Sequence, residues 1–150
     1  MRQAIITLLA ITMLAPAAFA GTGLVTKKSA HSVAQTLDRL EGALKDKGIV
    51  VFARIDHTAG AKKAGMSLRS TELLIFGNPK LGTPLMQSKQ TIGIDLPLKV
   101  LAWEDENGQV WLTYNAPDFL ANRHGITDRA QVLTKMTEAL QKLTDVATKP

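Results

Sequence analysis

The most informative absence from this 150-residue chain is cysteine, of which it has none. Without thiols the chain has no disulfide bond, no thiol nucleophile, no cysteine-ligated metal and no lipid attached at a cysteine. Aromatic residues are also few, at 5% of the sequence. The fold must therefore be held together by an aliphatic core.

Long hydrophobic runs are absent beyond the first twenty residues, and no later segment approaches the roughly 20 apolar residues of a membrane-spanning helix. We therefore expect a protein that is not membrane-embedded. The first twenty residues have the parts of a secretory signal in order: Arg2, an apolar stretch over 4–15, and the small-residue site Ala18-Phe19-Ala20. We predict a signal peptide over 1–20, cleavage before Gly21, and export to the periplasm or out of the cell.

Clustered charge is absent as well. The chain has 18 Lys and Arg against 13 Asp and Glu, a net charge of +5, and its lysines are scattered, several of them beside acids. Nucleic-acid surfaces usually gather Arg and aromatic residues on one face. This composition, together with export, predicts a solvated surface and no nucleic-acid partner.

The spacing of apolar and capping residues predicts several helices. Ser32, with Gln35 three residues later, has the pattern of a capping box and opens a helix. Thr83 followed by Pro84 predicts the start of a short helix. Further helices are predicted over 117–123, ending at Gly125, and after Thr127, where apolar residues recur at helical intervals: Leu133, Met136, Leu140 and Leu143.

Five β-rich runs are predicted as strands, and the last two form a hairpin. Asn107-Gly108 is the preferred pair for a two-residue type I′ turn. That turn places Trp103 opposite Leu112 on a core face, with Leu101 beside it. It places Trp111 opposite Glu104 on the other face, together with Val100, Ala102, Thr113 and Asn115. The strands are predicted at 21–28, 49–56, 71–76, 98–105 and 109–115, with 57–65 as a loop of small residues, either without helix or with one helical turn over 61–64.

The order of these elements predicts the fold class. A strand, a helix, several strands and a final helix indicate an α+β protein, an antiparallel sheet with its two main helices on one face. The strands at 49–56 and 71–76 are nevertheless apolar on both faces. The second face needs a cover, which the segment 83–90, a second subunit or a ligand could supply. We expect the function to lie on that face.

Short motifs run in order along nearly all of the chain after residue 20. They are Ala53–His57, Ala59–Ala61, Thr71–Pro79, Gly82–Met86, Asp95–Lys99, Trp103–Asp105 and Arg123–Gly125. In these motifs the chain resembles the domain of unknown function 302 (DUF302) family. The resemblance implies a single domain over 21–150, a strand-helix-four-strand-helix topology similar to that of the TATA-binding protein, and association into homodimers. It implies no established activity and nothing about DNA.

The main candidate for a ligand site is the polar sheet face around Trp111. An aromatic ring flanked by Glu104, Thr113 and Asn115, with Lys99 or Glu72 at the border, has the composition of both small-ligand pockets and interface centres. The alternative is a tryptophan packed beneath a loop. His57, at a strand end, completes the predicted ligand-binding set.

A second hypothesis is a metal-binding protein or an enzyme. Asp56 and His57 stand together at a strand end, and His124 supplies a second imidazole if the fold brings it near. The alternative is two histidines hydrogen-bonded to neighbouring groups. The helix start at Gly82-Thr83-Pro84, with Asn78-Pro79 before it as a turn, is a candidate anion site, but an ordinary helix N-terminus is the simpler interpretation.

The sequence thus favours a non-enzymatic small-ligand-binding or protein-interaction module that forms a homodimer. It contains no nucleophile elbow, no paired acid motif and no zinc metallopeptidase spacing. We predict no catalytic residue, no metal site and no cofactor, and an unidentified small ligand as a further partner.

Overall fold

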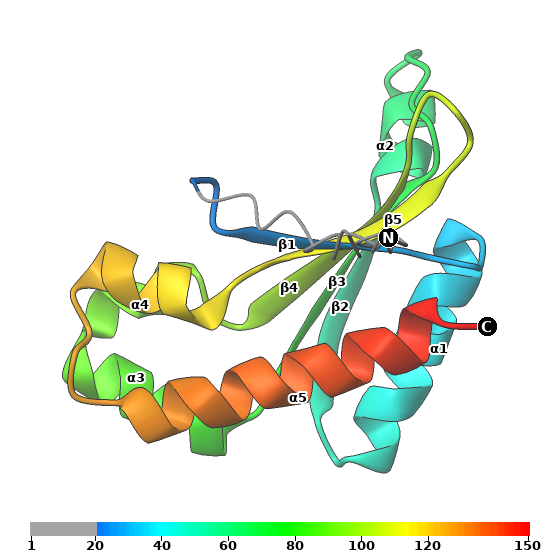
Figure 1. Cartoon of the computed structure of the whole chain (residues 1–150). Coiled ribbons are helices and arrows are strands. Elements are labelled where there is room, and N and C mark those ends of the chain that lie inside the picture. The colour runs from blue at the N-terminus through cyan, green and yellow to red at the C-terminus, as the bar shows by residue number, and fades with distance from the viewer. Residues whose placement is uncertain (1–20) are drawn as a thin grey trace, which may run out of the picture.

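A five-stranded antiparallel sheet with strand order β1-β5-β4-β3-β2 forms the centre of the computed structural model, which describes residues 21–150. The predicted signal peptide lies outside the described residues. The two long helices, α1 and α5, lie together on one side of the sheet, below it in Figure 1. The predicted α+β class and strand-helix-four-strand-helix order are therefore confirmed, with shorter helices inserted between the main elements.

The strands are β1 (Leu24–Lys28), β2 (Val50–Asp56), β3 (Thr71–Gly77), β4 (Leu98–Glu104) and β5 (Val110–Asn115). The helices are α1 (Val33–Asp46), α2 (His57–Lys63), α3 (Pro79–Ser88), the 3-10 helix η1 (Gln90–Ile94), α4 (Pro117–His124) and α5 (Ala130–Thr148).

Helix α1 begins at the predicted capping box. The Ser32 side chain accepts a hydrogen bond from the Gln35 backbone N–H, and the Gln35 side chain accepts one from the Ser32 N–H, both at 3.2 Å. Leu37, Leu40 and Leu44 of α1 are 0% exposed. They pack against the sheet and against α5, whose four predicted apolar residues are also buried.

Three helix predictions were wrong at their boundaries. Helix α5 is preceded by Arg129 rather than Thr127. Helix α3 begins at Pro79, because the Asn78 side chain caps it by accepting from the Lys80 N–H at 2.9 Å, so Thr83 is not a cap. The segment 57–65, predicted as a loop with at most one helical turn over 61–64, contains α2 from His57 to Lys63, which Asp56 caps by accepting from the Ala59 N–H at 2.8 Å. An Asn-Pro pair is itself a capping signal, which the turn interpretation overlooked.

The hairpin of β4 and β5 has a different register from the predicted one. Its loop contains three residues, Glu106–Gly108, because the Asp105 carboxylate accepts the backbone N–H groups of Asn107 and Gln109, each at 2.9 Å. Gly108 has φ +75°, the left-handed position that such three-residue loops require. The strands therefore pair one residue out of the predicted register, with Trp103 opposite Trp111.

This one-residue difference exchanges the two faces of β4. Val100 and Ala102, predicted to face outward, are 0% exposed under the helices. Leu101 and Trp103, predicted to lie in the core, are on the other face of the sheet. Their cross-strand partners there are Thr113 and Trp111 respectively. We call this side the open face: it is the side of the sheet away from α1 and α5. Helix α3 packs against α5 and η1, so the segment 83–90 does not cover the open face.

Candidate functional site

Two tryptophans lie side by side on the open face, at the hairpin end of β4 and β5. Trp103 of β4 and Trp111 of β5 are direct cross-strand partners, with ring centroids 6.4 Å apart and an interplanar angle of 27°. Such stacked pairs contribute more than their buried area alone. Both side chains are partly exposed. The arrangement presents two adjacent indole surfaces on the side of the sheet that lacks the long helices.

Both indole nitrogens already have hydrogen-bond acceptors within the chain. Trp103 Nε1 donates to Thr113 Oγ1 at 2.9 Å, and this hydroxyl lies 3.1 Å from Thr26 Oγ1. Trp111 Nε1 donates to Asp105 Oδ2 at 2.8 Å. With their polar groups paired, the two rings have fixed orientations and offer mainly apolar surface to a binding partner.

The hydrogen bond from Trp111 also acts on the Asp105 carboxyl. Together with the N–H groups of Gln109 and Asn107, it stabilises the ionised form, so the pKa of Asp105 is lowered from its usual range. A single carboxylate thus holds both the hairpin loop and one of the two indoles.

An apolar strip extends from the tryptophans across the next row of the sheet. In this row Ile55 pairs with Leu73, Leu73 with Leu101, and Leu101 with Thr113. Ile55 is 40% exposed, whereas Leu73 and Leu101 are partly buried. The open face is therefore apolar at its centre, as the sequence of β3 predicted.

Two predicted site residues, Lys99 and Asn115, meet at the far end of this face. With Asp95 they line a cavity of about 120 Å³. The ammonium group of Lys99 donates to the carbonyl oxygens of Pro97 at 3.0 Å and Asp95 at 3.2 Å, so backbone groups hold it in place. Glu104 follows Trp103 in the strand and points to the other face, so it does not lie beside Trp111.

The structure does not bring Asp56, His57 and His124 together. Asp56 caps α2, and His57 is exposed at the first position of that helix. His124 Nε2 lies 2.6 Å from Asp95 Oδ2, and Asp95 comes just before the start of β4. Asp56 pairs with Glu72, which in turn pairs with Ala102 near the end of β4. The histidines therefore lie at opposite ends of the central strands. Within residues 21–150 no group of three or more His, Asp or Glu side chains is placed to hold a metal ion.

His124 instead joins α4 to η1. Its Nε2 is paired with Asp95, and its Nδ1 lies 3.1 Å from Thr91 Oγ1. Arg123 adds a 3.3 Å contact to the same carboxylate. This is the hydrogen-bonded histidine that the sequence left open as the alternative to a functional one.

The covered face carries an ion-pair cluster centred on Arg54 of β2. Its guanidinium contacts Asp38 at 2.6 Å and Glu41 at 3.3 Å on α1, and Glu72 at 2.7 Å on β3. Burial opposes the charge, but hydrogen bonds to the Asp38 and Glu72 carboxylates outweigh it, and the pKa of Arg54 is raised. The cluster joins α1 to the sheet.

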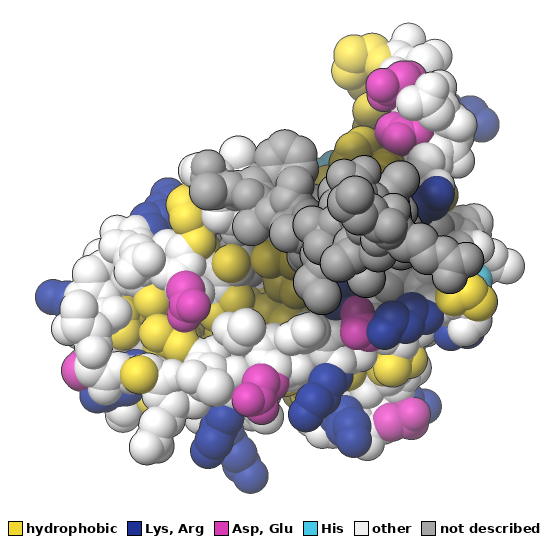
Figure 2. Space-filling model, viewed as in Figure 1, with side chains coloured by type: hydrophobic (Ala, Val, Ile, Leu, Met, Phe, Trp, Pro, Cys, Tyr) yellow, Lys and Arg dark blue, Asp and Glu magenta, His cyan; other side chains and the backbone are white. Residues whose placement is uncertain are grey.

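The space-filling view agrees with the scattered charge of the sequence. Lys and Arg side chains are spread over the outer surface, while hydrophobic side chains gather in a hollow between α4, α5 and the sheet (Figure 2). In the part of the chain that the structure describes, no helix has the length and apolar character needed to cross a membrane.

Sequence reasoning placed Trp111, Asn115 and Lys99 on or beside the open face but missed Trp103. The error came from the hairpin register. The available signal was Asp105, two residues before the Asn-Gly pair, because Asp can accept backbone N–H groups two residues ahead and so compete with a two-residue turn.

The fold and this surface define a class: a two-layer α+β domain whose prominent feature, within residues 21–150, is an apolar sheet face that the two long helices do not cover. The chain belongs to the family described as domain of unknown function DUF302, which matches residues 25–143. A crystal structure of an uncharacterized conserved DUF302 protein from Bacillus stearothermophilus has the same fold, with a TM-score of 0.74 and 20% identity over 84% of this chain and 98% of that one.

Sequence relatives include longer proteins from Brucella. The Fluoride-specific ion channel FluC 1 of Brucella suis is 55% identical over 114 residues, which are 76% of this chain and 45% of that protein. FluC 1 of Brucella abortus has the same identity, with 42% of its length covered. This chain therefore spans less than half the length of these relatives.

Proposed function

We propose that this chain is a non-enzymatic interaction module that associates with a second copy of itself through the open face. The observation that carries the proposal is the stacked pair of Trp103 and Trp111, continued by Leu101, Leu73 and Ile55, on the side of the sheet away from the long helices. Contiguous exposed apolar patches of this kind usually mark interaction sites.

The composition of the open face supports a protein partner. Aromatic residues at the centre and polar residues at the border are typical of interfaces. Here Thr71 pairs with Trp103 and Lys28 with Trp111, which puts polar side chains at both ends of the tryptophan row. Lys99 and Asn115 lie at the far end and form part of the same border.

A second copy suits this face because its centre requires no complementary charge. The indole N–H of Trp103 donates to the Thr113 hydroxyl, which is itself paired with the Thr26 hydroxyl. A surface whose central polar groups are already paired can be buried against an identical surface without leaving them unsatisfied. Two-fold pairing of identical patches is the commonest form of oligomer.

The predicted ligand-binding residues have unequal parts in this proposal. Trp111 is the expected anchor, since tryptophans are frequent energetic centres of interfaces. Asn115 and Lys99 are expected at the border, where substitutions have small effects. His57 and Glu104 lie away from the apolar centre and are not expected to contribute. A small ligand on this face would compete with the second copy for Trp111.

We further propose that the module acts after export, in the periplasm or outside the cell. The support is the signal-like order of residues 1–20 in the sequence. Mass spectrometry of the protein recovered from its own host checks this directly: a mature N-terminus at Gly21 is expected, and an intact Met1 on the recovered protein would contradict export by this route.

Sedimentation equilibrium tests the interaction. The mature chain is expected to form a dimer at micromolar concentration, and Trp111→Ala to weaken dimerisation by at least roughly tenfold, as for a typical interface anchor. Ile55→Lys, on the exposed edge of the same face, should act in the same direction. Val146→Ala is the matched control, because Val146 is 53% exposed on the outer side of α5. Circular dichroism shows whether each variant is folded.

Two results would contradict the proposal. One is a wild-type protein that stays monomeric at every accessible concentration. The other is a dimer that Trp111→Ala and Ile55→Lys leave unchanged while both variants are folded.

The Brucella relatives favour a second candidate, in which the partner is a membrane channel. In those proteins a segment 55% identical to this chain is part of a polypeptide named as a fluoride-specific ion channel. Covalent joining suggests that the two parts act at the same place. The test is co-purification of the mature chain with the remaining part of the Brucella suis protein: retention that Trp111→Ala abolishes is expected, and no retention would remove this candidate.

A further inference from the structure

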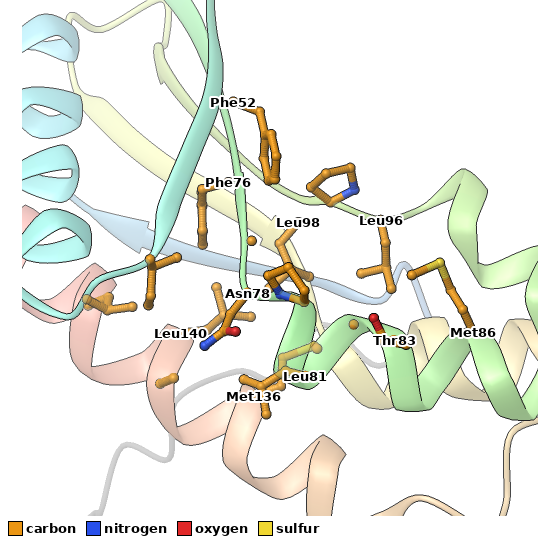
Figure 3. A pocket seen from close by; sticks show the side chains of 17 residues that line it. Phe52, Phe76, Asn78, Leu81, Thr83, Met86, Leu96, Leu98, Met136 and Leu140 are labelled. Carbon is orange, nitrogen blue, oxygen red and sulfur yellow. The ribbon is translucent and has the colours of Figure 1, made fainter.

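A cavity of about 290 Å³ lies on the helix side of the sheet, apart from the open face. Its walls come from the start of β2, the end of β3, the segment leading into β4, and helices α3 and α5. Figure 3 shows the side chains that point into it from these elements, among them Phe52, Phe76, Met86, Leu98, Met136 and Leu140. Neither Trp103 nor Trp111 lines this cavity.

Local irregularities in the strands create the space. The pairing of β2 with β3 shifts its register between Val51 and Ala53, which takes Phe52 out of the regular alternation and leaves it 55% exposed at the cavity wall. Helix α3 begins directly after β3, so the chain turns away at Asn78 before it can close the gap. The cavity is therefore formed by the edge of the sheet itself, where β2 is bulged and β3 leads into α3.

The lining determines what kind of molecule the cavity can accept. Among the described residues no Lys, Arg, His, Asp or Glu lines it, so an ionised group entering it would lose hydration without gaining a counter-charge. The flexible side chains of Met86 and Met136 can adapt to ligands of different shape. The chemistry of the walls therefore selects neutral, apolar molecules.

Two polar groups give the site a direction. The Asn78 side-chain oxygen accepts the Lys80 N–H, which leaves its amide NH₂ as a donor without a partner among residues 21–150. Thr83 also lines the cavity, is exposed to solvent, and its hydroxyl has no hydrogen-bond partner within the described residues. Pockets for small molecules combine apolar walls with a few such orienting groups.

We propose that this cavity binds a neutral, mainly aliphatic molecule that carries one hydrogen-bond-accepting group, which Asn78 and Thr83 receive. At roughly 30 Å³ for each non-hydrogen atom, as for water in the liquid, the cavity volume corresponds to a ligand of about ten such atoms. This matches a medium-length alcohol or a short ester.

Isothermal titration calorimetry of the mature protein with 1-octanol tests the proposal, with octanoate at neutral pH as the charged counterpart. Saturable binding of 1-octanol is expected, at least tenfold tighter than that of octanoate. No saturable binding of 1-octanol up to its solubility limit would overturn the proposal, and tighter binding of octanoate would overturn the neutral class.

Two helical glycines, one at the cavity and one away from it, allow the same substitution to be compared at both places. Gly82 of α3 lines the cavity, and a Cβ there would lie 3.7 Å from Leu96 Cδ1, an ordinary contact, so we expect the larger side chain of Gly82→Leu to occupy the cavity. Gly42 of α1 also lies inside a helix and has no atom within 4 Å of an added Cβ. Gly82→Leu is expected to weaken 1-octanol binding at least tenfold, and Gly42→Leu to leave it within twofold.

Equal binding by folded wild-type and Gly82→Leu proteins would overturn the assignment of the site. Should Gly82→Leu fail to fold, Ala139→Leu fills the same cavity from α5 and carries the same expectation. The cavity is not lined by Trp103 or Trp111, so 1-octanol is expected to leave the sedimentation of the wild-type protein unchanged. The cavity and the dimer can therefore be tested separately.

Discussion

Leu73 and Leu74 are consecutive residues of β3 that point to opposite faces of one sheet. Leu74 is 0% exposed beneath the helices, whereas Leu73 is only partly buried and pairs with Ile55 and Leu101 on the open face. The covered face buries its side chains within the chain itself, and the open face has comparable side chains that its own helices do not reach. The difference separates residues that hold the fold from residues available for binding.

The largest expected effect is that of Leu74→Ala. Truncating a fully buried leucine removes its packing and leaves a cavity, which costs about 2–5 kcal/mol of unfolding free energy. Urea denaturation followed by circular dichroism measures it. Leu73→Ala is the matched comparison and should cost clearly less in the monomer, on the order of 1–2 kcal/mol, because less of its surface is buried. Equal losses in the two variants would remove the distinction between the faces.

The ion-pair cluster on the covered face should give an intermediate effect. Arg54→Met leaves the Glu72 carboxylate, whose side chain is only 15% exposed, without its partner. We expect a loss of about 1–3 kcal/mol, the penalty for an unsatisfied buried polar group. Adding Glu72→Gln to Arg54→Met should restore part of the loss, because the uncompensated charge is then gone.

Arg39→Met is the control for this measurement. The Arg39 guanidinium contacts only the carbonyl oxygens of Val146 and Lys149 among the described residues, so its removal leaves no carboxylate unpaired. An Arg54→Met variant no less stable than Arg39→Met would show that the cluster contributes little.

The smallest expected effect concerns acid and the open face. The pKa of Asp105 is lowered in the folded protein, chiefly by the hydrogen bond from Trp111. A carboxyl with a lowered pKa stabilises the fold fully above its ordinary value of about 3.9, and this contribution is lost as the pH falls through the lowered value. Tryptophan fluorescence titrated below that ordinary pKa should therefore change as Asp105 becomes protonated.

Asp105→Asn should remove this fluorescence transition while keeping an acceptor for the indole N–H. Asp46→Asn, at the end of α1 and far from both tryptophans in sequence and fold, should leave the transition in place. A transition that persists in Asp105→Asn would mean that another group reports on Trp111.

Much of the covered side was predictable from sequence because its signals are local. Ser32 and Gln35 lie within one helical turn of each other, and the buried residues of α5 recur at a fixed interval. The start of α3 was misplaced because two Pro-containing capping signals, at Asn78 and Thr83, lie close together, and the earlier one begins the helix.

The candidate sites were predictable only in part. The apolar character of both faces of β3 indicated an uncovered face, and Trp111 was correctly placed on it. Its partner Trp103 was not, because a single side chain, Asp105, changes the loop length. The cavity beside α3 depends on the bulge at Phe52 and on the tertiary position of α5, neither of which leaves a pattern in the sequence.

The three-residue connection at Glu106–Gly108 has a consequence for natural variation in this protein. A shift of the pairing by one residue, with Glu106 opposite Gln109, would turn β5 over relative to β4, so that Leu112 and Tyr114 would point outward and both Trp111 and Thr113 inward. Because the Asp105 carboxylate sets the register, homologues without an acceptor at this position are expected to carry compensating polarity changes in their last strand.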